Sequence, residues 1–334
     1  MSKLAYGLLQ LFQSFVVTND KIVKPYTKML KLGFVSAILA DKSFEEVVQF
    51  ASANRFSCVE MMCWPKGKAE RRYAGVTHVN VSELDDNEVQ SLKKTLNENK
   101  VFISGLGYYP NPLDPDKEQA AYYREHIKKV IRAAPKLGVG VVNTFVGRDP
   151  AKNMEDNLSE FAKHFPAIVK EAEDHGVKIG IENCPMYFTN DEWPSGKNLA
   201  ISPAVWRKMF EIIPSASFGL NYDPSHLVWM QMDHVKPIYD FKDRLHHIHL
   251  KDVKVYKDKL DEVGILATPL EYHSPKIPGL GDVRWGDFFA ALTDVGYKGP
   301  VVIEVEDKAY EDSEEDIKTA ILSARNYVGQ FLVL

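Results

Sequence analysis

Four stretches in the second half of the chain alternate large hydrophobic residues with small or polar ones. In FGLNYDPSH (218–226), the large apolar residues share one face, while the other face carries Gly219, Asn221 and Asp223. A period of two is typical of a β-strand. Pro224 follows the carboxylate and ends the strand. The pattern therefore predicts a buried strand with an acid at its carboxyl end.

The other three stretches share this alternation, and each carries an acid or a histidine near its carboxyl end. They are VKIGIENC (177–184) with Glu182, LHHIHLKD (245–252) with His249, and VVIEVED (301–307) with Glu304. Single residues of this kind have simpler explanations, since an acid can cap the next helix and a histidine can belong to the core. Their recurrence at the ends of four successive strands favours a shared site.

Further strands and helices alternate along the rest of the chain. Strands are expected at 31–37, 57–62, 101–109 and 139–147, and helices at 43–54, 85–100, 117–137, 153–175, 203–213, 234–243, 285–295 and 313–331. Ser43 and Glu46 have the spacing of a capping box, and Gly176 is suited to end a helix. Eight strand–helix units predict an α/β fold, a (β/α)8 TIM barrel, whose chemistry lies at the carboxyl ends of the strands.

In such a barrel the four strand-end residues meet at one mouth. Three carboxylates and one imidazole form a set suited to a divalent metal ion. We therefore expect Glu182, Asp223, His249 and Glu304 to bind one cation. The donor set fits Mn²⁺, Mg²⁺ or Co²⁺ and is compatible with Zn²⁺.

Several motifs resemble those of a known group of enzymes. They are IEN with Glu182, DPSH with Asp223 and His226, HIHLKD with His249, VIEVED with Glu304, and the loop IPGLGDVRW (277–285). Over residues 30–328 the chain resembles the sugar phosphate isomerase/epimerase superfamily, the xylose isomerase-like TIM barrels, which include ketose 3-epimerases and inosose dehydratase.

The resemblance implies a function and roles for individual residues. It implies a metal-dependent isomerase or epimerase that acts on a ketose or related polyol carbonyl compound through an enediolate. Glu182 and Glu304 are then the catalytic proton carriers, and His226 contacts the substrate. A cation that polarises a carbonyl also acidifies the neighbouring C–H, so the implied chemistry agrees with the donor set.

Further residues are candidate substrate contacts. Asn143 faces inward from the fourth strand, and Tyr108 and Tyr109, at the end of the third, are candidates to line a sugar pocket. In ketose epimerases an arginine lies about six residues beyond the metal histidine, whereas Val255 occupies that position here and an insertion (254–274) follows. The candidate replacements are Lys251, Asp252 and, from the insertion, His273, although the insertion can also be a surface hairpin.

Other functions use parts of the same pattern. A lyase, such as a dehydratase of a keto-inositol or an enzyme eliminating from a 3-keto-glycoside, needs the same metal and the same first proton abstraction. A repair nuclease of this fold needs a trinuclear zinc cluster, but CVEMM and FISGLGYY hold no histidine. A sugar-binding barrel without catalysis has little need of both glutamates. Paired acids alone also suit glycoside hydrolysis, which does not require an imidazole-bearing metal set.

The composition and charge of the chain narrow the range of expected binding partners. The net charge of −5 opposes nucleic-acid binding, so the expected partner is a small carbohydrate or cyclitol. Asp282, beside the glycines of the 277–285 loop, argues against a phosphorylated substrate. Three cysteines without a CxxC pair suit a reducing compartment, and the cytoplasm is expected.

The amino-terminal residues form a separate segment in this interpretation. Residues 1–28 are assigned as an extension and residues 29–334 as a single barrel domain. The apolar stretch 4–17 resembles a signal-peptide core, but no small-residue cleavage site follows. It is too short to span a membrane, so no membrane partner is expected. A homodimer is compatible with the extension and the tyrosines.

Overall fold

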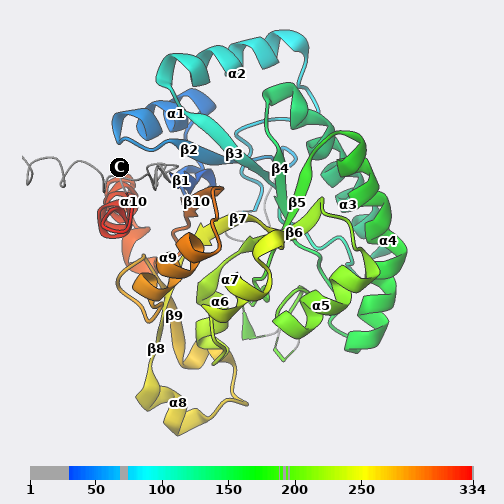
Figure 1. Ribbon diagram of the computed structural model, residues 1–334, viewed down its shortest axis with the longest axis vertical. Helices are drawn as coiled ribbons and strands as arrows, with labels where there is room; N and C mark the ends of the chain where they lie inside the picture. Colours follow the sequence, from blue (N-terminus) through cyan, green and yellow to red (C-terminus); the bar gives the residue numbers. More distant parts are fainter. Residues whose placement is uncertain (1–29, 68–73, 188, 191–192, 195, 333–334) are drawn as a thin grey trace, which may run out of the picture.

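Eight parallel strands close into a barrel in the order β1-β10-β7-β6-β5-β4-β3-β2 (Figure 1). The computed structural model describes residues 30–67, 74–187, 189–190, 193–194 and 196–332. The expected extension, 1–28, lies outside the described residues. The barrel strands are β1 (Lys31–Val35), β2 (Cys58–Met62), β3 (Phe102–Gly107), β4 (Val141–Thr144), β5 (Lys178–Glu182), β6 (Phe218–Tyr222), β7 (Leu245–Leu250) and β10 (Pro300–Ile303). The predicted (β/α)8 barrel is confirmed.

Helices follow the strands and cover the outside of the barrel. They are α1 (Phe44–Ala53), α2 (Asp86–Asn99), α3 (Lys117–Ala133), α4 (Met154–Asp174), α5 (Pro203–Ile212), α7 (Lys236–Asp240), α9 (Trp285–Asp294) and α10 (Glu314–Gly329). The capping box is formed, since Ser43 accepts from the Glu46 amide and its own amide donates to the Glu46 carboxylate. Gly176 has φ of +65° directly after the α4 C-cap, as its sequence position predicted.

The alternation along each strand separates the helix-facing core from the barrel interior. Phe218 of β6 packs against Phe161 and Phe165 of α4, with ring centroids 5.7 and 6.4 Å apart. Tyr222 packs against Trp206 of α5 and Phe288 of α9. The large residues of this strand therefore face the helices, which leaves the small and polar face to the interior.

Two additions interrupt the regular alternation. The short helix α6 (Pro224–Trp229) begins directly after β6. After β7, the antiparallel strands β8 (Asp252–Val255) and β9 (His273–Lys276) form a hairpin that carries α8 (Lys257–Val263), at the bottom of the view in Figure 1. The insertion thus forms a hairpin, which was one of the two explanations left open. No helix in the described part of the chain is both long and apolar enough to cross a bilayer.

Candidate metal centre and active site

Glu182, His249 and Glu304 come together at the carboxyl ends of β5, β7 and β10. One ligand atom from each lies within 4.8 Å of the other two. His249 Nδ1 lies 3.2 Å from Glu304 Oε2 and 3.7 Å from Glu182 Oε1. Glu182 ends β5, His249 is inside β7, and Glu304 directly follows β10, so parallel strand pairing brings these three side chains to one mouth.

Asp223 is fixed in the same mouth by the start of α6. Pro224 occupies the first helical turn, where its missing N–H costs no hydrogen bond. Asp223 caps this helix, and its Oδ1 accepts from the Ser225 amide at 2.8 Å. The backbone of Asp223 is held by the side chain of Asn183, at 2.8 and 2.9 Å. One carboxylate oxygen, Oδ2, therefore remains directed toward His226 and Lys251.

Lys251 places its ammonium group among the carboxylates. Nζ lies 3.2 Å from Asp223 Oδ2, 3.0 Å from Glu304 Oε2 and 3.1 Å from Glu306 Oε2. Lys251 therefore links Asp223 to the Glu182–His249–Glu304 group. Burial opposes its charge, but Glu304, Glu306 and Asp223 outweigh this effect and hold the pKa of Lys251 well above its ordinary value.

The same balance acts on His249. Burial alone would favour the neutral ring, but the carboxylates of Glu60 and Glu304 hold the pKa of His249 well above its ordinary value. For Glu304, burial raises the pKa, while the nearby charges of Lys251 and His249 overcome that effect and lower it. The carboxylates gathered at the mouth are therefore balanced by the positive charges of Lys251 and His249.

The arrangement fits a divalent metal ion. Two ligand atoms at about 2.0–2.2 Å from one cation are about 3.0–3.5 Å apart at octahedral or tetrahedral angles. The 3.2 Å from His249 Nδ1 to Glu304 Oε2 matches this spacing. Nδ1 of His249, Oε2 of Glu304 and Oδ2 of Asp223 are also buried, and beyond the ion-pair contacts given above they make no hydrogen bond to the described residues. The residues that would hold the cation are Glu182, Asp223, His249 and Glu304.

Two other groups of potential ligands occur in the described residues. Glu182, Cys184 and His226 form one group, next to the four residues above. Glu60, His247 and His249 form the other, inside the barrel. In this second group Glu60 Oε2 lies 2.7 Å from His249 Nε2, which is a hydrogen-bond distance and shorter than two ligands of one cation normally allow.

The predicted substrate contacts differ in where they lie. His226 lines the mouth, with Nε2 3.1 Å from Asp223 Oδ2 and Nδ1 3.3 Å from the donating Trp229 indole nitrogen. Lys251 lines two cavities at the mouth. Their roles in binding substrate stay predictions.

The structure does not bring Tyr108 and Asn143 to this mouth. Tyr108 packs edge-to-face on Trp64 and His126, with centroids 4.9 and 4.6 Å apart, in the layer beneath α3. Asn143 pairs with Gly180 in the register of β4 and β5, two residues before Glu182. It lies between glycines of β3 and β5, one layer deeper than the ligand set.

Other residues complete the site. Tyr109, the second of the two candidate tyrosines, and Phe145 line the inner cavity together with Glu182, Lys251 and Glu304. Some of the missed residues follow the alternation already noted: Asn221 shares the inward face of β6 with Asp223, and Glu306 continues that of Glu304. Glu60 could have been noticed for a different reason: it is a carboxylate in the middle of CVEMM, a strand that is buried along its whole length.

Comparison with known proteins agrees with this architecture. The model of the xylose isomerase-like TIM barrel family matches residues 48–327. The chain belongs to this family. The chain also resembles the uncharacterized protein YfiH of Bacillus subtilis, 26% identical over 90% of this chain and 100% of YfiH.

Further relatives and structures carry more specific names. An inosose dehydratase of Bacillus thuringiensis is 25% identical, but the match spans 46% of this chain and 65% of that protein. A crystal structure of D-psicose 3-epimerase in the presence of D-fructose has a TM-score of 0.66 at 13% identity, covering 90% of this chain and 99% of that one. The IOLI protein with a bound zinc atom has a TM-score of 0.67 at 16% identity, covering 91% and 100%. At these identities the two structures support the fold.

Proposed function

We propose that this protein is a divalent-metal-dependent sugar isomerase or epimerase acting on a ketose or related polyol carbonyl compound. The observation that carries the proposal is that two glutamates, Glu182 and Glu304, flank Nδ1 of His249 in one cavity. When bound, the cation would polarise the substrate carbonyl and stabilise the negative charge that develops on its oxygen. The metal is proposed to be held by these three residues and Asp223.

The two glutamates are proposed to move the proton. One carboxylate removes it from the carbon next to the carbonyl, which gives an enediolate, and the other returns a proton from a different side. The lowered pKa of Glu304, caused by Lys251 and His249 against the effect of burial, makes that carboxylate a weak base. Its effectiveness must therefore come from its position in a cavity with few competing waters.

Lys251 and His226 are proposed to orient the substrate. The Lys251 ammonium group is a donor within reach of Asp223, Glu304 and Glu306, so a substrate oxygen entering between these acids would meet it. Nε2 of His226 points to Asp223 Oδ2. A metal-dependent lyase is the second candidate, supported by the partial match to an inosose dehydratase. It would use the same first proton abstraction, followed by loss of a leaving group.

Variants of the two glutamates test the proposal directly. Glu182→Gln and Glu304→Gln should retain some metal but lose about two to four orders of magnitude in rate, the usual contribution of a positioned acid or base. Metal content is measured by elemental analysis, with one divalent cation expected per chain. A metal-loaded screen of ketoses, inososes and 3-keto-glycosides, read for product mass and configuration, separates epimerase from lyase.

Solvent exchange provides the decisive control. Turnover in D₂O should place deuterium at the carbon next to the carbonyl. Product without deuterium there would indicate a hydride shift, and the glutamates would then be metal ligands only. A His226→Ala protein should keep its metal and turn over more slowly; loss of metal from it would assign His226 to the ligand set instead.

A further inference from the structure

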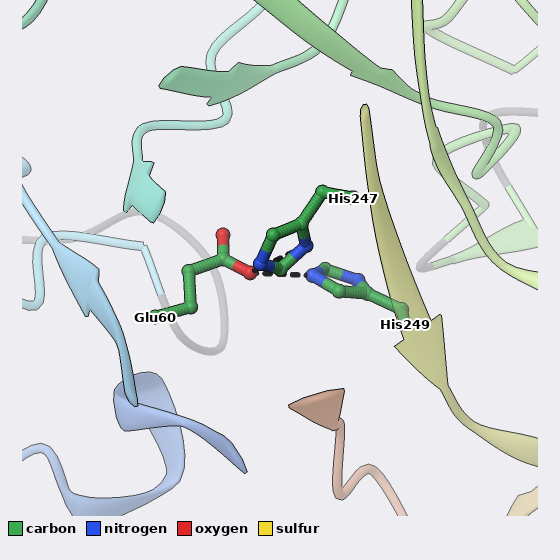
Figure 2. A group of neighbouring side chains, drawn as sticks. All are labelled: Glu60, His247 and His249. Atoms are coloured by element: carbon green, nitrogen blue, oxygen red, sulfur yellow. Dashed lines mark hydrogen bonds and ion pairs between the residues drawn. The ribbon is translucent and has the colours of Figure 1, made fainter. Parts of the chain in front are cut away.

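We infer that Glu60 is a positioning residue for the metal centre: its carboxylate accepts the Nε2–H of His249 and thereby reserves Nδ1 for the cation. Figure 2 shows Glu60 reaching from β2 toward the two β7 histidines. Glu60 Oε2 lies 2.7 Å from His249 Nε2, whereas Nδ1 of the same ring faces Glu182 and Glu304. The inference rests on the metal centre proposed above and adds a residue outside its ligand set.

The two ring nitrogens of His249 face different carboxylates: Nε2 faces Glu60, and Nδ1 faces the proposed metal ligands Glu182 and Glu304. A neutral imidazole carries one N–H donor and one acceptor nitrogen. Carboxylates face both nitrogens, so a cation that takes the place of a proton on Nδ1 leaves the one remaining proton on Nε2, where the Glu60 carboxylate accepts it. A metal binds the lone pair. The carboxylate therefore presents His249 to the cation in the correct form and at a fixed ring angle.

The barrel interior is built to bring this carboxylate across to β7. Glu60 is fully buried, and a register shift lies between Val59 and Glu60 in the pairing of β2 with β3. Gly107 of β3 leaves the necessary space, because a Cβ there would lie 2.7 Å from Glu60 Oε1 and 2.2 Å from the Met62 methyl group. An unpaired buried carboxylate would be strongly unfavourable, so Glu60 requires its donors.

Tyr109 and Asn221 complete the surroundings of this carboxylate. The Tyr109 hydroxyl donates to Glu60 Oε1. The Asn221 side-chain nitrogen lies 3.0 Å from that hydroxyl and 2.9 Å from His249 Nε2. Since Nε2 cannot donate to Glu60 and accept from Asn221 together, the shorter, charge-assisted contact with Glu60 decides the proton position.

The neighbouring histidine, His247, does not compete for this role. Its Nδ1 lies 3.7 Å from Glu60 Oε2, beyond hydrogen-bond range, and 3.0 Å from Asn221 Oδ1. Its Nε2 lies 3.1 Å from the Ser104 hydroxyl. Glu60 therefore acts on His249.

Metal affinity of three single variants tests the inference. The purified full-length protein is titrated with Co²⁺ against a competing chelator, and the visible absorption of bound Co²⁺ is recorded. Glu60→Leu should weaken Co²⁺ binding about ten- to a hundredfold and shift the Co²⁺ bands, because the ring of His249 is no longer held. Glu60→Gln should recover much of the affinity, since its amide oxygen can still accept from Nε2–H. Ser104→Ala is the matched control; it alters only the contact of His247 and should bind Co²⁺ normally.

A second measurement uses the unaltered protein, so it still tests the inference if the Glu60→Leu protein does not fold. In Zn²⁺-loaded protein labelled with ¹⁵N-histidine, NMR should show one metal-bound imidazole protonated on Nε2 and bound through Nδ1. The reverse tautomer, or unchanged affinity and spectrum in Glu60→Leu, would overturn the inference while leaving the metal centre intact. Failure of the unaltered protein to bind any divalent cation would overturn both.

Discussion

The ammonium group of Lys251 lies 3.0 Å from the carboxylate of Glu304, although the two residues come from the ends of different strands. This contact places a permanent positive charge among acids that would also bind a divalent cation. The lysine and the cation repel each other, so each weakens the binding of the other to the shared carboxylates. We therefore expect Lys251 to reduce the affinity of the mouth for a divalent cation.

Lys251→Met tests this opposition. The variant keeps an unbranched side chain, shorter by one heavy atom, and removes its charge, so we expect metal affinity equal to or higher than that of the unaltered protein. Loss of a charged hydrogen-bond donor should lower kcat/KM by about ten- to a hundredfold. Affinity is measured by chelator competition and kcat/KM by steady-state kinetics. Lys257→Met, on the exposed start of α8, is the control; weaker metal binding by Lys251→Met would contradict the argument.

The second prediction concerns Asp252, which organises the loop before α9. Its two oxygens accept from the backbone amides of Val253, Gly279 and Val283, at 2.8–3.0 Å, and from the indole nitrogen of Trp285, at 2.8 Å. A phosphate bound at this loop would need the same donors. The loop is therefore occupied by a carboxylate of the protein itself.

Asp252→Asn should destabilise the fold by about 2–4 kcal/mol, because charge-assisted bonds become weaker and one acceptor oxygen becomes a donor facing N–H groups. Denaturant unfolding monitored by circular dichroism measures the change. Asp282→Asn is a useful comparison, since Asp282 is partly exposed and should cost much less. Equal losses would show that burial of Asp252 has no special effect.

The positions of the four proposed ligands could be predicted because the alternation of residues along each strand indicates which side chains face inward. The alternation places Asp223, His249 and Glu304 on the interior face, and the barrel closes as expected. Contacts between side chains from opposite sides of the barrel could not be predicted in this way. That Glu60 meets His249 depends on a register shift in β2 and on the absence of a side chain at Gly107, neither of which has a local pattern.

Tyr108 and Tyr109 are a second case in which the sequence alone could not predict which side chain reaches the site. Adjacent residues in an extended segment face opposite sides, so only one of the two can reach the mouth. The sequence YY does not say which. The structure places Tyr108 beneath α3 and Tyr109 beside Glu60 and His249. The pairing of β3 with β2, which fixes this choice, is a long-range contact.

A third prediction concerns stability at acidic pH. His246 is buried, with Nδ1 3.0 Å from the Ile179 carbonyl oxygen, and burial lowers its pKa to about 4. In the unfolded chain the ring binds a proton near pH 6.5, so between pH 6.5 and 4 the unfolded state holds more protons. The stability contribution is complete above pH 6.5 and is lost as the pH falls through about 4. The full loss is about 3 kcal/mol.

His246→Gln should remove this part of the pH dependence. The variant is less stable at pH 7 if the Ile179 hydrogen bond is lost, but its free energy of unfolding should fall less steeply between pH 6.5 and 4. Urea unfolding at several pH values provides the slopes. His164→Gln, a partly exposed histidine on α4, is the control. Parallel curves for the unaltered protein and His246→Gln would show that another group causes the acid sensitivity.

The last prediction concerns the outer cavity, about 710 Å³ in volume, which continues from His226 and Lys251 to the β8–β9 hairpin. Burial lowers the pKa of His273 to about 4, and this neutral ring stacks on Trp229 with centroids 4.8 Å apart and an interplanar angle of 12°.

Under the proposed function, a single sugar at the metal centre would leave this space to a second ring. We therefore expect His273→Ala to raise KM about three- to tenfold for a two-ring keto-glycoside, the range of one aromatic contact, while a free ketose changes less than about twofold. Tyr239→Ala, on an exposed surface contact with Asp294, is the control. An equal rise for both substrates would mean that the hairpin supports the metal centre and does not bind the second ring.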